Sequence, residues 1–125
     1  MGQVMSRKFH LNKLVRDGIV PSMLNSAQQP ENRKLSESEL RPALIAKIIE
    51  EAGECDLPDL LEVVETLAKL EGKTFKEVRE AQLTKRAKLG GYSEGVYIGA
   101  LILKDNDPWV DYYAADPDRF PETLN

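Results

Sequence analysis

Apolar residues recur at helical spacing along two consecutive stretches in the middle of the chain. The first stretch places them at Leu44, Ile45, Ile48, Ile49 and Ala52, and the second at Leu60, Leu61, Val63, Val64, Leu67 and Ala68. Residues three and four apart share one face of an α-helix. Each stretch therefore predicts an amphipathic helix that buries one stripe against a neighbour.

Capping signals set the ends of these two helices. Ser36-x-x-Glu39 fits a capping box, so the first helix is expected from about Ser38 to Gly53. Asp56 is the expected N-cap of the second helix, which continues to Leu70. Only a very short joint is left between the two helices.

A third helix is expected from Phe75 to about Leu89, because Thr74-x-x-Glu77 is another capping box and Gly90-Gly91 can end a helix. The other segments carry weaker signals. Residues 8–23 have mixed extended or helical character, residues 25–34 read as a surface connection, residues 96–103 fit a short strand or a buried helix, and the tail from residue 105 is expected to be irregular.

These elements predict an all-α fold: an antiparallel helical bundle with a short irregular or strand-like C-terminal extension. A length of 125 residues fits one domain, 1–125, with a core of about 12–92 and an extension of 93–125. Short connections between the helices make the antiparallel arrangement the simplest one.

Composition narrows the class of protein. The formal net charge of −4 argues against nonspecific binding to nucleic acid or to an anionic membrane. Neither a signal segment nor a membrane-spanning apolar window is present, so a cytoplasmic location is expected. With His10 and Cys55 as the lone residues of their types, we expect no histidine zinc site, no Ser-His-Asp triad and no internal disulfide. Any catalysis would rest on carboxylates.

Carboxylates gather where the first predicted helix ends. Glu50, Glu51 and Glu54 share roughly one side of that helix. Glu51 lies at the margin of the apolar stripe, where a side chain can enter a crevice between packed helices. Because crowded carboxylates repel one another, a bound hard cation is one explanation. An ordinary acidic, solvated helix face is the other.

Asp56 and Asp59 offer a second carboxylate pair at the same three-residue spacing. A magnesium site takes its oxygen ligands from more than one element, so the two pairs together could hold the ion. The alternative is that an N-cap aspartate, followed by an acid in the first turn, stabilises the helix dipole. Glu62 and Glu65 fall largely opposite the apolar stripe and are expected on the surface.

Two basic clusters could contact phosphate groups: Lys13 with Arg16, and Lys85 with Arg86 and Lys88 before the glycine pair. The alternatives are a solvated edge for the first cluster and stabilisation of a helix C-terminus for the second. The familiar glycine-rich phosphate loops are absent from the sequence. Any nucleotide would be held by another scheme.

Five segments carry a family resemblance when taken in order: Asn12-Lys13-Leu14-Val15-Arg16-Asp17, Leu35-Ser36-Glu37-Ser38-Glu39, Lys47-Ile48-Ile49-Glu50-Glu51-Ala52-Gly53-Glu54, Asp56-Leu57-Pro58-Asp59-Leu60-Leu61-Glu62-Val63-Val64 and Lys85-Arg86-Ala87-Lys88-Leu89-Gly90-Gly91-Tyr92. Together they resemble a MazG-like branch of the all-α nucleoside triphosphate pyrophosphohydrolases, often described as phosphoribosyl-ATP pyrophosphohydrolase-like. The resemblance covers roughly residues 12–92.

The resemblance implies a Mg²⁺-dependent enzyme, with Mn²⁺ as a substitute, in which water attacks a nucleoside triphosphate to release pyrophosphate and a nucleoside monophosphate. Such enzymes remove noncanonical or surplus nucleotides. It also implies that family's bundle fold and a homodimer or homotetramer. The site residues that it implies are Glu51, Glu54, Asp56 and Asp59 for the metal, Glu50 and Glu51 for catalysis, and Lys13, Arg16, Lys47 and Lys85 for the substrate.

The chain departs from the family at two places. Only Cys55 separates Glu54 from Asp56, whereas the family places about a dozen residues or more between the acidic motifs, and Leu89 stands where Arg is usual. A tight hairpin, a long kinked helix completed by another chain, or a degraded site would each fit this spacing. A nucleotide-binding protein without catalysis and a helical interaction protein are the competing functions.

Overall fold

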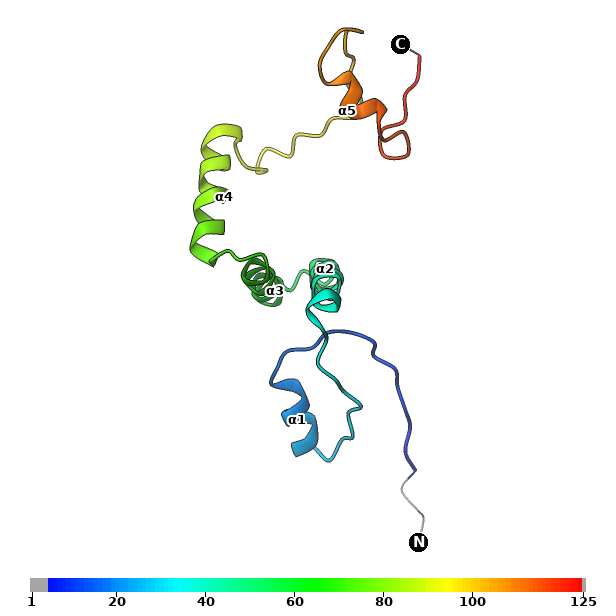
Figure 1. The fold of residues 1–125 in the computed structure, drawn as a ribbon, viewed down its shortest axis with the longest axis vertical. Helices are drawn as coiled ribbons and strands as arrows, with labels where there is room; N and C mark the ends of the chain where they lie inside the picture. Colours follow the sequence, from blue (N-terminus) through cyan, green and yellow to red (C-terminus); the bar gives the residue numbers. More distant parts are fainter. Residues whose placement is uncertain (1–4, 125) are drawn as a thin grey trace. The chain divides into compact units, whose positions relative to one another are not determined.

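The computed structural model describes residues 5–124, and the regular structure in that range is helical, with no strand (Figure 1). The expected all-α class is confirmed. The chain divides into two units between Lys88 and Leu89. The helices are α1 (Ile19–Asn25), α2 (Glu37–Gly53), α3 (Leu57–Leu70), α4 (Phe75–Leu89) and α5 (Val110–Ala114).

Helices α2 and α3 form an antiparallel hairpin, and within residues 5–124 they are the only helices that pack against each other. Arg41 near the start of α2 forms an ion pair of 2.7 Å with Glu71 at the end of α3. Between the helices, Leu44 retains 2% exposure and Ala68 retains 7%. The stripe predicted from the sequence therefore includes the buried apolar residues of the hairpin.

The N-termini of these helices follow the predicted capping chemistry. Ser36 forms the full capping box with Glu39, and α2 begins at Glu37, one residue before the expected start. Asp56 accepts a hydrogen bond of 3.1 Å from the backbone N–H of Asp59, as an N-cap does. The local signals thus place both helix starts to within one residue.

The joint between α2 and α3 is a Schellman turn. The N–H of Asp56 donates to the carbonyl of Glu51 at 3.1 Å, and the N–H of Cys55 donates to the carbonyl of Ala52 at 3.2 Å. Cys55 occupies the left-handed position with φ 55°, where glycine is usual. The chain therefore adopts the tight hairpin and not one long kinked helix.

The N-terminal segment contains a helix that the sequence left unassigned. Helix α1 covers Ile19–Asn25 and also ends in a Schellman turn, with Ala27 at φ 59°. Residues 5–18 precede it without regular helix. This segment supplies one wall of the groove described below.

The second unit, taken by itself, differs from the expected pattern. The apolar run 96–103 forms neither the strand nor the buried helix that its composition suggested. Its side chains are open to solvent, with Tyr97 at 90% exposure and Ile98 at 72%. The tail contains α5, which the sequence did not predict, beside a cluster of aromatic rings from Trp109, Tyr112, Tyr113 and Phe120.

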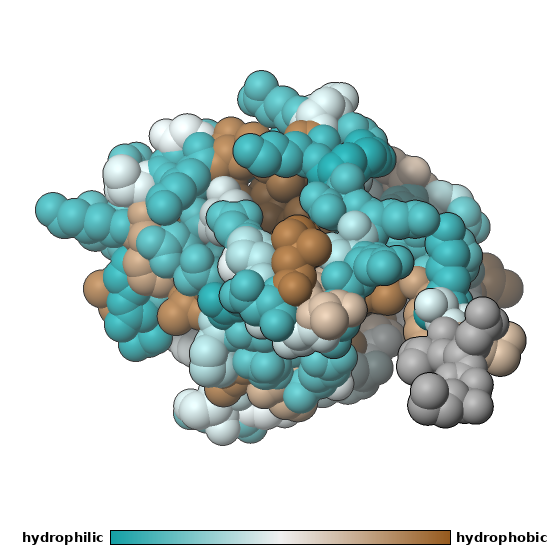
Figure 2. Space-filling view, turned by 90° about the horizontal axis from the view of Figure 1, so that it is seen from below, coloured by the Kyte–Doolittle hydropathy of each residue, from teal (hydrophilic) through white to brown (hydrophobic). Residues whose placement is uncertain are grey.

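Large apolar side chains also lie on the surface of the first unit. Ile49 on α2 is 69% exposed and Leu61 on α3 is 52% exposed. Figure 2 shows hydrophobic residues scattered among hydrophilic ones on one side of the molecule. No helix in the described part of the chain is long and apolar enough to cross a membrane.

Candidate functional site

A groove of about 390 Å³ lies between the N-terminal segment and the α2–α3 hairpin. This volume falls in the range of small-molecule sites. One part of the lining is charged and the other is apolar. The lining residues are Leu11, Lys13, Val15, Arg16, Ile19, Met23, Lys47, Glu50, Glu51, Glu54, Asp59, Glu62 and Val63.

Glu51 is the buried carboxylate of this groove, with 4% exposure. Its Oε1 forms an ion pair of 3.2 Å with Nζ of Lys47, one helical turn earlier. Its Oε2 is buried and has no hydrogen-bond partner among the described residues. Burial of a polar atom without a hydrogen-bond partner lowers the stability of the folded state. We therefore expect this oxygen to bind a ligand from outside the described residues.

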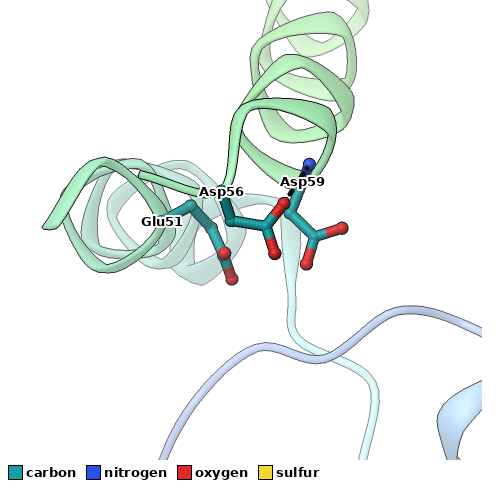
Figure 3. A group of neighbouring side chains, drawn as sticks. All are labelled: Glu51, Asp56 and Asp59. Carbon is teal, nitrogen blue, oxygen red and sulfur yellow. Dashed lines mark hydrogen bonds between the residues drawn. The ribbon is translucent and has the colours of Figure 1, made fainter. Parts of the chain in front are cut away.

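Asp56 and Asp59 bring two further carboxylates to Glu51 (Figure 3). One oxygen from each of the three residues lies within 4.8 Å of the other two. The Schellman turn and the N-cap produce this arrangement, because they set the start of α3 beside the last turn of α2. Asp56 is thus the N-cap of α3 and Asp59 is an acid of its first turn, and both also belong to the acidic group.

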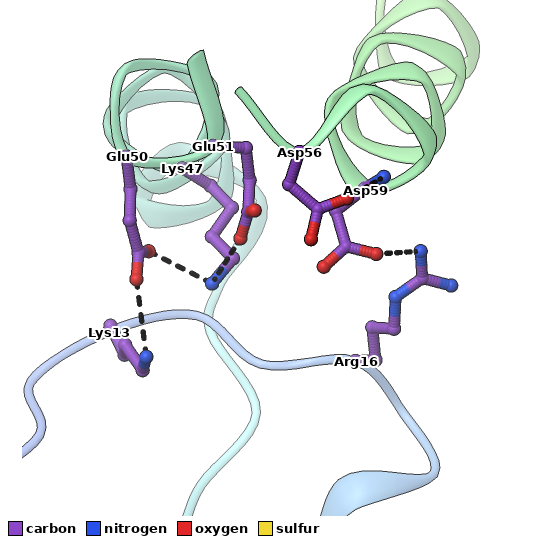
Figure 4. Close-up of polar contacts among 7 residues, drawn as sticks. All are labelled: Lys13, Arg16, Lys47, Glu50, Glu51, Asp56 and Asp59. Atoms are coloured by element: carbon purple, nitrogen blue, oxygen red, sulfur yellow. Dashed lines mark hydrogen bonds and ion pairs between the residues drawn. The ribbon is translucent and has the colours of Figure 1, made fainter. Parts of the chain in front are cut away.

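Three cations contact the carboxylates around this group (Figure 4). Lys47 lies 2.9 Å from Glu50, and Lys13 lies 3.2 Å from the same carboxylate. Arg16 donates to Oδ1 of Asp59 at 2.6 Å. The chain thus brings basic and acidic residues of three separate motifs to one place.

Hydrogen bonding explains the shifted pKa values of this network. The hydrogen bond from Lys47, supported by that from Lys13, lowers the pKa of Glu50. Burial acts to lower the pKa of Lys47, but its bonds to Glu50 and Glu51 outweigh burial, and its pKa is raised. The hydrogen bond to Asp59 raises the pKa of Arg16. Glu50, Lys47 and Arg16 are therefore charged at neutral pH.

The structure brings together most of the residues that the sequence nominated, which are Lys13, Arg16, Lys47, Glu50, Glu51, Asp56 and Asp59. Two nominated residues lie apart from this group. Glu54 lines the groove but is exposed and does not belong to the group of three close carboxylates. Lys85 lies on α4, outside the groove lining.

Sequence reasoning missed the apolar part of the groove. Leu11, Val15, Ile19 and Met23 line it from the N-terminal segment, and Val63 lines it from α3. The first four residues are spaced four apart, and this spacing was the available signal. Glu62, expected on the surface, is exposed and also lines the groove.

The donor set fits a hard divalent cation. Carboxylate oxygens from two helices are ligands that Mg²⁺ takes in proteins, and phosphate or water oxygens complete such a shell. The partnerless Oε2 of Glu51 belongs to a residue of the three-carboxylate group, which supports the same fit. The residues that would hold the ion are Glu51, Asp56 and Asp59, of which Glu51 and Asp59 line the groove.

Comparison of the chain with known protein families, curated proteins and solved structures gave no match.

Proposed function

We propose that this chain is a Mg²⁺-dependent nucleotide pyrophosphohydrolase of the MazG-like all-α type, with the helical bundle fold of that family. It acts on a noncanonical or surplus nucleoside triphosphate, and the products are a nucleoside monophosphate and pyrophosphate. The observation that carries the proposal is the buried Glu51, whose Oε2 has no hydrogen-bond partner within residues 5–124 and lies beside two more carboxylates. The ordered series of motifs supplies the substrate class by resemblance.

The charge balance of the groove supports a cation-dependent role. Its lining contains five carboxylates and three basic side chains. The basic side chains do not neutralise the acidic ones, and the remaining negative charge attracts a divalent cation. A bound cation also lets an anionic triphosphate approach carboxylates that would otherwise repel it.

Each residue of the site has a role that its surroundings suit. Glu51, Asp56 and Asp59 hold the cation, which when bound neutralises phosphate charge and makes a bound water easier to deprotonate. Glu54 remains a candidate outer ligand, since it lines the groove. Lys13, Arg16 and Lys47 contact the phosphates, and Lys85 would join them only through movement of α4.

Glu50 is better suited to organising the lysines than to accepting a proton. Its pKa is lowered by Lys47 and Lys13, and a lower pKa makes a carboxylate a weaker base. Glu51 has an oxygen without a partner and lies closer to the aspartates. We therefore assign the activation of the attacking water to Glu51 and not to Glu50.

The test measures pyrophosphate release from a panel of nucleoside triphosphates in Mg²⁺ or Mn²⁺. Wild type should release pyrophosphate, and Glu51→Gln should lower the rate by at least about 100-fold, the size of effect that follows when one transition-state-stabilising group is removed from an active site. Glu71→Gln is the matched control, because Glu71 is an ion-paired carboxylate on the same hairpin but outside the groove. Its rate should equal that of wild type.

Other outcomes separate the competing functions. Thermal stabilisation by a nucleotide without pyrophosphate release would identify a binding protein that lacks catalysis. No response to cation or nucleotide would leave a helical interaction protein, which the exposed apolar residues of α2 and α3 would then serve. Either result would refute the proposed hydrolase.

The same exposed residues favour a homodimer or homotetramer. Ile45, Ile49 and Leu61 project apolar surface from the hairpin, and burial against a second copy would complete a bundle. Light scattering after size exclusion would report the mass of the assembly. A monomer at micromolar concentration would contradict this part of the proposal. The cytoplasmic location also stays a prediction.

A further inference from the structure

An N-terminal stretch, residues 11–23, lies beside the acidic end of the hairpin, and we call it the strap. Its apolar residues Leu11, Val15, Ile19 and Met23 line the groove. Its two basic residues reach the carboxylates on both helices: Lys13 contacts Glu50 on α2, and Arg16 contacts Asp59 on α3 (Figure 4). The strap is thus held to the hairpin at its charged end by two ion pairs.

One of these ion pairs uses a carboxylate of the candidate cation site. Asp59 belongs to the three-carboxylate group, and its Oδ1 accepts from the Arg16 guanidinium at 2.6 Å. A guanidinium and a divalent cation beside the same carboxylate repel each other and share its lone pairs. Closure of the strap and binding of a cation therefore oppose each other, while Oε2 of Glu51 stays without a partner.

We infer that the strap competes with the divalent cation for this site, with Arg16 standing in the place of the cation beside Asp59 until the cation displaces it. The inference rests on the proposed function, because it takes the same carboxylates as ligands. Displacement frees Arg16 from Asp59, and its guanidinium then turns to anionic phosphate oxygens. Phosphate groups draw the strap back over the groove.

The inference has a thermodynamic consequence. Cation alone must break the Arg16 ion pair before it binds, whereas cation with a polyphosphate returns a partner to Arg16. The two ligands are therefore coupled, and each raises the affinity for the other. A cation without phosphate is held weakly, which keeps the site from filling before substrate arrives.

The test measures Mn²⁺ affinity by calorimetry on the full chain without nucleotide. Arg16→Ala should bind Mn²⁺ about two- to fivefold more tightly than wild type, since a half-exposed ion pair contributes at most about 1 kcal/mol. Arg41→Ala is the matched control, because its ion pair with Glu71 has a length of 2.7 Å and similar exposure but lies outside the groove. Its Mn²⁺ affinity should equal that of wild type.

Weaker or unchanged Mn²⁺ binding by Arg16→Ala would refute competition between the strap and the cation. It would not refute the proposed cation site. Arg16→Gln keeps most of the side-chain volume and should give the same increase if the alanine variant fails to fold. If neither wild type nor the Arg16 variants bind Mn²⁺, both the strap and the proposed function are wrong. Mn²⁺ binding by the Arg16 variants but not by wild type would support competition between the strap and the cation.

Hydrogen exchange of the wild-type chain gives a second measurement that needs no variant. Mn²⁺ should speed the exchange of the Ile19 and Ser22 amides, which donate to the carbonyls of Arg16 and Gly18, because release of the Arg16 ion pair lets this turn open. Addition of inorganic pyrophosphate with Mn²⁺ should slow it again. Slower exchange in Mn²⁺ alone would show that the cation tightens the strap, and the inference would be wrong.

Discussion

The α2–α3 hairpin and the second unit, residues 89–124, differ in how their apolar residues are arranged. In the hairpin these residues recur at helical spacing between capped ends, and Leu44 is buried. In residues 96–103 the apolar residues are nearly continuous, without helical spacing or caps, and Ile98 stays exposed. Apolar content alone therefore does not produce an element here, whereas periodicity combined with caps does.

The two regions also differ in what holds them together. The hairpin combines buried aliphatic contact with side-chain caps and with the Arg41–Glu71 ion pair. The second unit relies on aromatic rings around α5, such as the edge-on pair of Tyr113 and Phe120 at 5.0 Å, and α5 has no side-chain cap. The hairpin can therefore position charged side chains on rigid elements, which a site requires.

The strongest challenge to this comparison is removal of Leu44, the most buried large side chain. Leu44→Ala should lower the free energy of unfolding by about 2–5 kcal/mol, because it opens a cavity in a small core. Ile98→Ala in the second unit should change it by no more than about 0.5 kcal/mol. Urea unfolding followed by helical circular dichroism measures both. Equal losses would mean that residues 96–103 are packed after all.

Asp56 allows the cap to be separated from the charge. Asp56→Ala should cost about 1 kcal/mol of stability, because the N–H of Asp59 loses its acceptor. Asp56→Asn keeps an N-cap oxygen and should retain wild-type stability, yet it should weaken Mn²⁺ binding like the alanine variant. Thermal unfolding and calorimetry report the two effects. If the asparagine variant kept full Mn²⁺ affinity, Asp56 would be a cap and no ligand.

The left-handed residue in the joint makes a stabilising substitution available. Cys55→Gly should raise the free energy of unfolding by about 0.5–1 kcal/mol, because glycine adopts φ 55° without a Cβ clash. Gly72→Ala, at φ 75° in the Schellman turn after α3, should have the opposite sign. Melting temperatures of the two variants measure this. A destabilised Cys55→Gly would indicate that the thiol makes a needed contact.

The smallest expected effect concerns acid. Hydrogen bonds from Arg33 and Ser36 lower the pKa of Glu39 to about 2 from an ordinary 4.5. Because the folded-state pKa is depressed, the contribution of Glu39 to stability is present above about pH 4.5 and is lost as pH falls toward 2. Glu39→Gln should flatten this part of the stability profile. Glu37→Gln, in the same turn but outside the capping box, should leave the pH dependence of stability between pH 4.5 and 2 unchanged.

The sequence was sufficient for the hairpin because its signals are local. Ser36 and Asp56 mark helix starts, and the apolar stripe includes the buried Leu44 and Ala68. Other members of the stripe, Ile45, Ile49 and Leu61, are exposed, which the spacing did not predict. It could not choose among three arrangements at Cys55, since a left-handed residue other than glycine leaves no pattern. It placed α4 correctly but implied that Lys85 joins the site, although helical spacing says nothing about what a helix packs against.

The candidate site was predictable in part for a related reason. Side chains on α2 and at the start of α3 were nominated from their spacing, and the tight joint brings Glu51, Asp56 and Asp59 together. The contacts of Lys13 and Arg16 with these helices span dozens of residues along the chain, and nothing in a single sequence encodes such pairings. The basic cluster and the family resemblance nominated Lys13 and Arg16 as phosphate contacts, but neither predicted their ion pairs with Glu50 and Asp59.

The Schellman turn at Cys55 makes the number of residues between Glu51 and Asp56 more important to the site than the identity of the exposed residues in the turn. One residue inserted late in α2 would rotate the exit direction by about 100° and carry the aspartates of α3 away from Glu51. Many replacements at exposed positions of the turn should be tolerated, but insertions and deletions should not. We therefore expect single-residue insertions and deletions across positions 52–57 to abolish pyrophosphate release far more often than substitutions at the exposed positions of the turn do.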